Sequence, residues 1–151
     1  MRSVSGASQW DLQWVMSVLP HRYPFLLVDR VLELEPGKRV VALKNVTVNE
    51  HYFQGHFPGH PVVPGVLLVE GLAQAGGLLL LHDLDDRDGK LLYFTSIEKA
   101  RFRRPVVPGD QVRYEVEVLQ KRSRYAKLAG RVMVGETLAA DAVITSAMVD
   151  R

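Results

Sequence analysis

The sequence predicts an α+β fold in which an antiparallel β-sheet wraps around one long central helix. One observation is the order of elements: a short helix, two strands, a long helix and then about four strands do not alternate as parallel βα units do. The other is the long helix itself, where between Val62 and Leu81 only Glu70 and Gln74 are polar. A helix that is apolar on all sides needs cover from the rest of the chain.

A short helix comes first in the chain. Ser8 is placed to cap it, and the apolar side chains of Trp10, Trp14 and Val18 are spaced for one stripe along its surface. Pro20 ends this helix, because the residue before a proline is pushed out of the helical conformation.

Two strands follow and are predicted to form a hairpin. The segments from Phe25 to Leu34 and from Arg39 to Val48 are rich in apolar and β-branched residues, and Pro36-Gly37 between them is a turn signal. The next stretch, Asn49 to Pro64, holds three prolines and two glycines. That composition is too broken for a helix or a central strand, so it predicts a loop.

The long helix is predicted from Pro64-Gly65 to about Leu81, because proline is well tolerated in a first helical turn. Three glycines inside it each weaken a helix by about 1 kcal/mol relative to alanine. They predict that something packs very close to the helix backbone, either a sheet or a second copy of the helix. These glycines are Gly71, Gly76 and Gly77.

The remainder is predicted as β-structure after an exposed, Asp-rich loop at residues 82–89. In Gln111 to Leu119 the apolar and charged side chains alternate, which is typical of a strand with one buried face. The other three predicted strands are Leu91 to Arg103, Ala126 to Val134 and Thr137 to Val149. No linker or repeat indicates a second unit, so residues 1–151 are expected to form a single domain.

The composition excludes several classes of function. The chain has no cysteine, which excludes disulfides, thiolate metal sites and a cysteine nucleophile. Met1 to Gln9 has no apolar run, so we expect a flexible terminus and not a signal peptide. The longest apolar run, Val62 to Leu81, contains Pro64 and Glu70 and is not expected to span a membrane. These features favour a cytoplasmic protein.

Charge is unevenly distributed along the chain. The net charge of +2 is too small to indicate nucleic-acid binding. Between Lys90 and Arg131, however, eleven Lys or Arg residues stand against four acidic residues. This excess has two interpretations that the sequence leaves open, an attraction for an acidic partner or the solvated face of a sheet.

The loop and the start of the long helix together carry residues suited to acid–base chemistry. His56 can act as a base near neutral pH. Glu70 in apolar surroundings should have a raised pKa and so hold a proton, with Gln74 one turn further along as its support. The backbone N–H groups of Gly65 and Val66 at the helix N-terminus can stabilise an oxyanion. A base, an acid and an oxyanion donor are what the elimination of water beside a carbonyl requires.

Other chemistries find less support in the sequence. There is no phosphate-binding loop, no dinucleotide glycine fingerprint and no nucleophile elbow. A metal site at His51, His56 and His60 is disfavoured, because prolines and glycines separate the three and Glu50 is the only carboxylate beside them. We therefore expect no metal.

The spacing of His56 and Glu70 raises a geometric difficulty. The two residues are 14 positions apart, and Glu70 lies about one and a half turns into the helix, roughly 8 Å from its start. They need not meet within one chain. A two-fold dimer offers a solution, in which the helix of one subunit presents its Glu70 to the His56 of the other.

Several ordered motifs resemble one known family. The run G-H-F-P-G-H-P-V-V-P-G-V-L-L-V-E-G-L-A-Q-A, from Gly55 to Ala75, resembles the signature of the β-hydroxyacyl-acyl carrier protein dehydratases of the FabZ class. So do L-P-H-R-Y-P-F-L-L-V-D-R-V at Leu19 to Val31, Y-F-T-S-I-E-K-A-R-F-R-R-P-V-V-P-G-D at Tyr93 to Asp110, and the spacing between these blocks. The resemblance covers nearly the whole chain beyond about Trp10.

This resemblance implies a hotdog fold that dimerises, often as a trimer of dimers. It implies dehydration of a (3R)-hydroxyacyl thioester to the trans-2-enoyl thioester in fatty acid biosynthesis, without metal or organic cofactor. The family's catalytic His and Glu fall on His56 and Glu70, contributed across the dimer, and its oxyanion amide falls near Gly65. A related class that also isomerises the double bond usually carries Asp at the helix position, so Glu70 favours plain dehydration.

The resemblance also names a partner and further residues. Tyr93 and Phe57 are candidates for the acyl tunnel, and His60 departs from the residue types expected after F-P-G. A carrier protein is typically acidic and presents its substrate on a phosphopantetheine arm, which gives the basic segment a meaning. The candidate docking residues are Arg101, Arg103, Arg104 and Lys121.

Two alternatives to the dehydratase remain at this point. The first is another hotdog activity, thioester hydrolysis or double-bond isomerisation. The second is a non-catalytic acyl-binding or assembly subunit, in which His56 and Glu70 would usually have been lost. Both residues are present.

Overall fold

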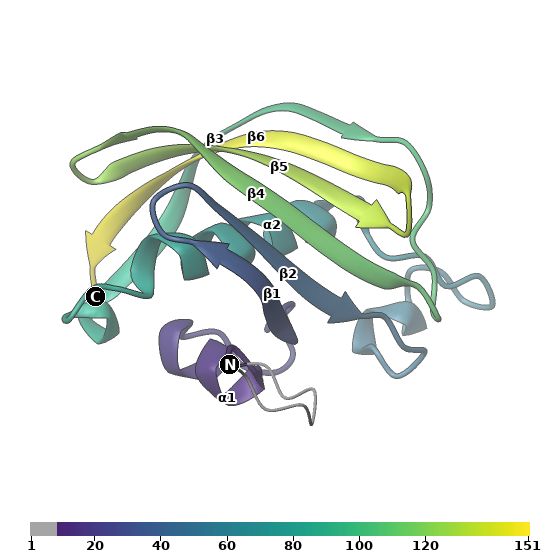
Figure 1. Cartoon of the computed structure of the whole chain (residues 1–151). Coiled ribbons are helices and arrows are strands. Elements are labelled where there is room, and N and C mark those ends of the chain that lie inside the picture. The colour runs from purple at the N-terminus through teal and green to yellow at the C-terminus, as the bar shows by residue number, and fades with distance from the viewer. Residues whose placement is uncertain (1–8) are drawn as a thin grey trace.

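The computed structural model describes residues 9–151. Six strands form one antiparallel sheet in the order β1-β2-β4-β5-β6-β3, and the sheet arches over the long helix α2 (Figure 1). The predicted α+β class and the wrapped central helix are therefore confirmed. The helices are α1 (Leu12–Val18) and α2 (Gly65–Leu81), and the strands are β1 (Arg30–Glu35), β2 (Arg39–Asn45), β3 (Lys90–Phe102), β4 (Gln111–Arg122), β5 (Tyr125–Val134) and β6 (Thr137–Asp150).

The long helix begins and ends where the sequence predicts. It contacts β2, β4, β5 and β6 along its length, while α1 packs against α2 and β1 from the other side. Twelve of its residues are buried. None of the helices within residues 9–151 is long and apolar enough to cross a membrane.

The three helix glycines mark close contacts within the chain. A Cβ on Gly71 would collide with the ring and hydroxyl of Tyr114 on β4, and one on Gly76 would lie 2.5 Å from Leu128 Cδ1 on β5. At Gly77 the neighbour is Leu19, 3.2 Å away. For two of the three, the partner is therefore the sheet of the same chain, one of the two arrangements that the sequence predicts.

The first helix differs from the prediction in its cap. Ser8, the predicted capping residue, lies outside the described residues, as does the predicted flexible terminus apart from Gln9. The helix instead begins at Leu12, and the side chain of Asp11 accepts a hydrogen bond of 3.0 Å from the Trp14 amide. An Asp oxygen caps an orphan helix amide as well as a Ser hydroxyl does.

The prediction of a strand from Phe25 is wrong, because β1 begins only at Arg30. The reason is that side chains take the backbone bonds a sheet would use. Gln74 binds the Phe25 carbonyl and the Leu27 amide, each at 2.8 Å, and the Tyr114 hydroxyl donates to the Leu27 carbonyl at 3.1 Å. Residues 25–27 are therefore bound to α2 and β4 by side chains and do not pair as a strand.

The other boundaries differ by a few residues. The strand predicted to Val48 ends at Asn45, and the loop of residues 49–64 contains a short 3₁₀ helix, η1 (His51–Gln54), that the sequence did not predict. A second short 3₁₀ helix, η2 (Arg87–Gly89), precedes β3. In β4 the predicted alternation is confirmed, since Val112, Tyr114 and Val116 are buried.

Replacing Gly71 with alanine should destabilise the fold. Alanine would favour the helix by about 1 kcal/mol, but its methyl group must displace the fully buried Tyr114 ring, which holds Leu27. We expect a net loss of about 2 kcal/mol in the free energy of unfolding, measured by chemical denaturation. The control is Gly89→Ala, where a Cβ meets nothing within 4 Å. Equal stability of the two variants would contradict the packing described here.

Candidate functional site

A cavity of about 180 Å³ lies beside the middle of α2. Glu70 and Gln74 of the helix line it, together with His21 from the turn after α1 and Tyr93 from β3. Most of the remaining lining is apolar, formed by leucines and by Phe94. The only carboxylate among its lining residues is that of Glu70, which makes this cavity the candidate acid–base site of the described chain.

The Gln74 side chain is held on three sides, and its orientation follows from its partners. Its Oε1 accepts from the Leu27 amide, and its Nε2 donates to the Phe25 carbonyl. Since an amide N–H can only donate and a carbonyl can only accept, the Nε2 group must face Glu70. It lies 3.0 Å from Glu70 Oε2. Gln74 is 1% exposed, so this support for Glu70 is rigid.

Burial raises the pKa of the Glu70 carboxyl above its ordinary value, and the hydrogen bond from Gln74 opposes that shift in part. The side chain is 18% exposed, on the side that faces the cavity. Because desolvation penalises the charged form, Glu70 is a group that keeps its proton to higher pH than an exposed glutamate.

His56 lies in the loop before α2, with its ring fixed by the backbone. Its Nδ1 is 2.7 Å from the Val62 carbonyl, and the Val62 amide donates back to the His56 carbonyl at 3.0 Å. A carbonyl only accepts, so Nδ1 carries the hydrogen and a neutral ring has its lone pair on Nε2. The His56 ring is therefore prepared to accept a proton at Nε2.

The first amides of α2 lie close to His56 in the chain. The Leu67 and Leu68 amides donate hydrogen bonds to the Pro64 carbonyl. Within the described chain, the Gly65 and Val66 amides have no backbone acceptor. Two free N–H groups at a helix N-terminus form a local anion site. The ring of Phe102, at the end of β3, packs over Gly65, where a Cβ would lie 2.9 Å from it.

The structure thus groups the predicted site residues in two places. Glu70, Gln74 and Tyr93 line one cavity, and His56 is not among its lining residues. Phe57 stacks on the His56 ring with centroids 4.0 Å apart and lines a separate, open groove with Tyr23 and His51. One chain therefore does not bring the predicted base and acid into a common cavity.

The predicted docking residues fall at opposite ends of the sheet. Arg101, Arg103 and Arg104 lie at the end of β3 and just beyond it, with Arg103 paired to Asp141 at 3.2 Å and Arg104 to Asp110 at 3.4 Å. Lys121 lies near the tip of the β4–β5 hairpin.

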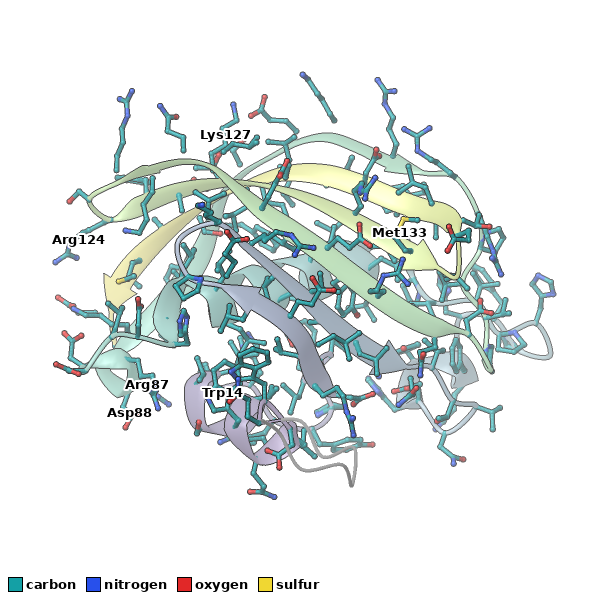
Figure 2. All side chains as sticks on the ribbon, in the orientation of Figure 1. Trp14, Arg87, Asp88, Arg124, Lys127 and Met133 are labelled. Atoms are coloured by element: carbon teal, nitrogen blue, oxygen red, sulfur yellow. The ribbon has the colours of Figure 1, made fainter. Side chains whose placement is uncertain are left out.

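Other basic side chains of this segment lie near the Lys121 end. Figure 2 shows Arg124 at the hairpin tip and Lys127 on the outer face of the sheet, pointing away from α2. Lys127 is paired with Glu98 at 3.4 Å and Arg124 with Asp150 at 3.8 Å. Part of the basic excess is therefore paired on the solvated face of the sheet.

His21 is a residue of this site that the sequence did not predict. Its Nε2 lies 3.7 Å from Glu70 Oε2, and its ring lines the same cavity. No spacing rule relates residues 21 and 70, since their proximity arises only when the turn after α1 folds against α2. The available signal was that His21 sits inside the block Leu19 to Val31 that resembles the family.

No metal site emerges from this arrangement. Within residues 9–151, no group of three or more His, Asp or Glu side chains is placed to hold a metal ion.

The chain was compared with known proteins. The model of the FabA-like domain family matches residues 19–143. The 3-hydroxyacyl-[acyl-carrier-protein] dehydratase FabZ of Koribacter versatilis is 55% identical over 141 residues, covering 93% of this chain and 90% of that protein. The FabZ of Variovorax paradoxus is 53% identical over 140 residues, covering 91% and 93%.

Solved structures with low sequence identity share the fold. The dehydratase heterocomplex ApeI:P from Xenorhabdus doucetiae superposes with a TM-score of 0.78 at 16% identity, covering 91% of both chains. A mutant of thioesterase PA1618 from Pseudomonas aeruginosa gives 0.68 at 15% identity, covering 95% of this chain and 100% of that one. Taken with the wrapped helix and the relatives above, these matches mean that the chain has the hotdog fold and belongs to the FabZ class of the FabA-like family.

Proposed function

We propose that this chain is a 3-hydroxyacyl-[acyl-carrier-protein] dehydratase of fatty acid biosynthesis, a lyase that converts a (3R)-hydroxyacyl thioester to the trans-2-enoyl thioester. The observation that carries the proposal is the desolvated Glu70 carboxyl, held by Gln74 in a cavity, in a member of the FabZ class. A carboxyl that burial makes hold its proton to higher pH than an exposed glutamate is suited to protonating a departing hydroxyl group.

The reaction assigns a role to each group. His56 Nε2 takes a proton from C2 of the acyl chain, and the amides of Gly65 and Val66 stabilise the negative charge that develops on the thioester oxygen. The C2–H electron pair forms the C2=C3 double bond while the C3–O bond breaks. Glu70 gives its proton to the departing hydroxyl, which leaves as water. Proton transfer from the His56 imidazolium back to the Glu70 carboxylate resets the site.

The proposed enzyme is a homodimer that completes each site with groups from both chains. Strand β3 supports this, because it is the edge of the sheet and pairs only with β6 within the described chain. It also exposes large apolar side chains that an isolated edge strand would leave in water, namely Tyr93, Phe94, Ile97 and Phe102. An exposed apolar edge of this length is a surface for pairing with another strand.

The course of β3 explains how two chains would complete a site. Its start lines the Glu70 cavity, and its end covers Gly65 beside the His56 loop. If two copies of β3 pair antiparallel about a two-fold axis, the start of one strand lies opposite the end of the other. The Glu70 cavity of one chain then faces the His56 loop of its partner. A trimer of dimers stays a prediction, as does the cytoplasmic location.

The product of the reaction tests the proposed activity. Purified protein given a (3R)-hydroxyacyl thioester on an acyl carrier protein should produce the conjugated enoyl thioester, followed by its absorbance and by mass spectrometry. Free acid would indicate a thioesterase, and a shifted double bond an isomerase. No turnover of the carrier-linked substrate would contradict the proposal and favour an acyl-binding subunit.

Mixed dimers test the shared site. His56→Ala and Glu70→Ala should each lower kcat at least about a hundredfold, because each removes one proton-transfer group. When the two variants are unfolded together and refolded in equal amounts, half the dimers should be mixed and contain one intact site, restoring roughly a quarter of wild-type activity. Mixtures as inactive as the separate variants would instead mean that each site lies within one chain.

We further propose that Arg101, Arg103 and Arg104 dock the acidic carrier protein, with Lys121 as a separate candidate at the other end of the sheet. The register supports treating them apart. Lys121 is opposite Ala126, Ala126 is opposite Ser146, and Ser146 is opposite Phe94 on β3, seven residues before Arg101 and about 23 Å from it along the strand. In a dimer paired through β3, the arginine group of one chain lies near Tyr93 of the partner, at the mouth of the cavity.

Charge reversal of single residues tests docking. Arg101→Glu is the cleanest change in the arginine group, because reversal of Arg103 or Arg104 also breaks an ion pair within the chain. It should raise KM for carrier-linked substrate about tenfold and KM for a short thioester less than about twofold. Lys121→Glu, measured in parallel, tests the other end. Equal effects on both substrates would remove the residue concerned from the docking proposal.

A further inference from the structure

Both recorded contacts of the Glu70 carboxyl converge on one oxygen. Gln74 Nε2 lies 3.0 Å from Oε2, and Nε2 of His21, which also lines the cavity, lies 3.7 Å from the same atom. Within the described chain, Oε1 has no such neighbour. The two oxygens of this carboxyl are therefore chemically distinct, one facing two nitrogen groups and the other left for a molecule in the cavity.

The turn that carries His21 is tied down by its neighbour. The Arg22 guanidinium donates to the carbonyls of Leu19, His21 and Met16, at 2.9, 2.6 and 3.0 Å. His21 follows Pro20, directly after the end of α1. The approach of its ring to Glu70 is thus set by the backbone of the turn.

The surroundings of the His21 ring favour one tautomer. Its Nδ1 is buried and has no hydrogen-bond partner among residues 9–151, whereas Nε2 lies on the side of the carboxyl. A neutral imidazole with its hydrogen on Nδ1 would bury an unpaired donor and turn a lone pair toward Oε2. With the hydrogen on Nε2, the N–H lies on the side of Oε2, where the 3.7 Å separation is an electrostatic contact longer than a hydrogen bond, and only a lone pair is left unpaired. The second arrangement costs less free energy.

We propose that His21 is a positioning residue for Glu70: Oε2 accepts the hydrogen bond from Gln74 and faces the His21 Nε2–H, so that Oε1 carries the proton given to the leaving hydroxyl. This inference rests on the acid role proposed for Glu70. It goes further in naming the Glu70 oxygen that donates the proton and the residue, 49 positions away in the chain, that determines which oxygen this is.

The charge state of His21 matters for this role. Burial, and secondarily the nearby Arg22 charge, lower the pKa of His21 from its ordinary value, which keeps the ring neutral near neutral pH. An imidazolium at this distance would instead favour the Glu70 carboxylate and remove the acid. The titratable and charged groups around the ring are Arg22 on its own turn, Glu70 on α2 and Tyr93 on β3.

Three variants test the role through the pH profile of kcat. His21→Phe keeps the ring volume and removes both nitrogens, His21→Gln keeps an N–H donor at the Nε2 position, and His82→Phe is a matched control at the end of α2. The alkaline limb of the profile reports Glu70, since activity is lost as pH rises through the pKa of the acid.

The Phe variant should lower kcat about tenfold with KM nearly unchanged. It should also move the alkaline limb to higher pH by about half a unit, because a donor that stabilises the carboxylate is gone. The Gln variant should have most of the wild-type kcat, and its alkaline limb should lie at the wild-type pH. His82→Phe should change neither kcat nor the limb. The melting temperatures of all three variants should lie near that of the wild type.

Adding the changes to a Glu70→Gln background separates this inference from the proposed function. If His21 acts through Glu70, His21→Phe has no further effect on the residual kcat of Glu70→Gln. A further tenfold loss there, an unmoved alkaline limb, or equal losses in the Phe and Gln variants would overturn the positioning role while leaving the dehydratase intact. Full activity of Glu70→Gln itself would instead overturn the acid role.

Discussion

Burying a carboxyl inside an apolar helix is the constraint on which the rest of this structure depends. Glu70 is tolerated because Gln74 binds it, and Gln74 is fixed because it takes the backbone bonds of Phe25 and Leu27. The Tyr114 hydroxyl also binds this segment, at the Leu27 carbonyl. The Tyr114 ring fits against α2 only because residue 71 is glycine. The sheet, the helix and the chain before β1 therefore share one hydrogen-bonded arrangement, and the acid lies at its centre.

Much of the fold could be predicted from the sequence, because local patterns specify it. The bounds of α2 follow from Pro64-Gly65 and an apolar run in which only Glu70 and Gln74 are polar, and β4 follows from the alternation of apolar and charged residues. The order of strands could not be predicted, since it depends on where α2 lies across the sheet. The start of β1 was predicted too early for a similar reason, because the groups that take its backbone bonds lie 47 to 87 positions away.

In the candidate site, too, the residues related by local spacing could be predicted and those that meet only on folding could not. Glu70 and Gln74 could be paired by helical spacing, and His56 could be picked out by its loop. His21 could not, since only the folded chain brings it to Glu70. The chain alone also leaves His56 outside the Glu70 cavity, and the exposed edge of β3 is the surface best suited to join two incomplete halves. A dimer formed through β3 would explain both the exposed edge of that strand and the division of the site between two places in one chain.

The most direct test of this account is the titration of Glu70 itself. In protein labelled with ¹³C at glutamate side chains, the Glu70 carboxyl resonance can be assigned by its disappearance in Glu70→Gln and followed with pH. The account predicts that this carboxyl titrates above the ordinary pKa of 4.5, because burial disfavours its charged form more than Gln74 stabilises it. Titration at or below the ordinary value would mean that Glu70 is ionised at neutral pH, and an acid role for it would be contradicted.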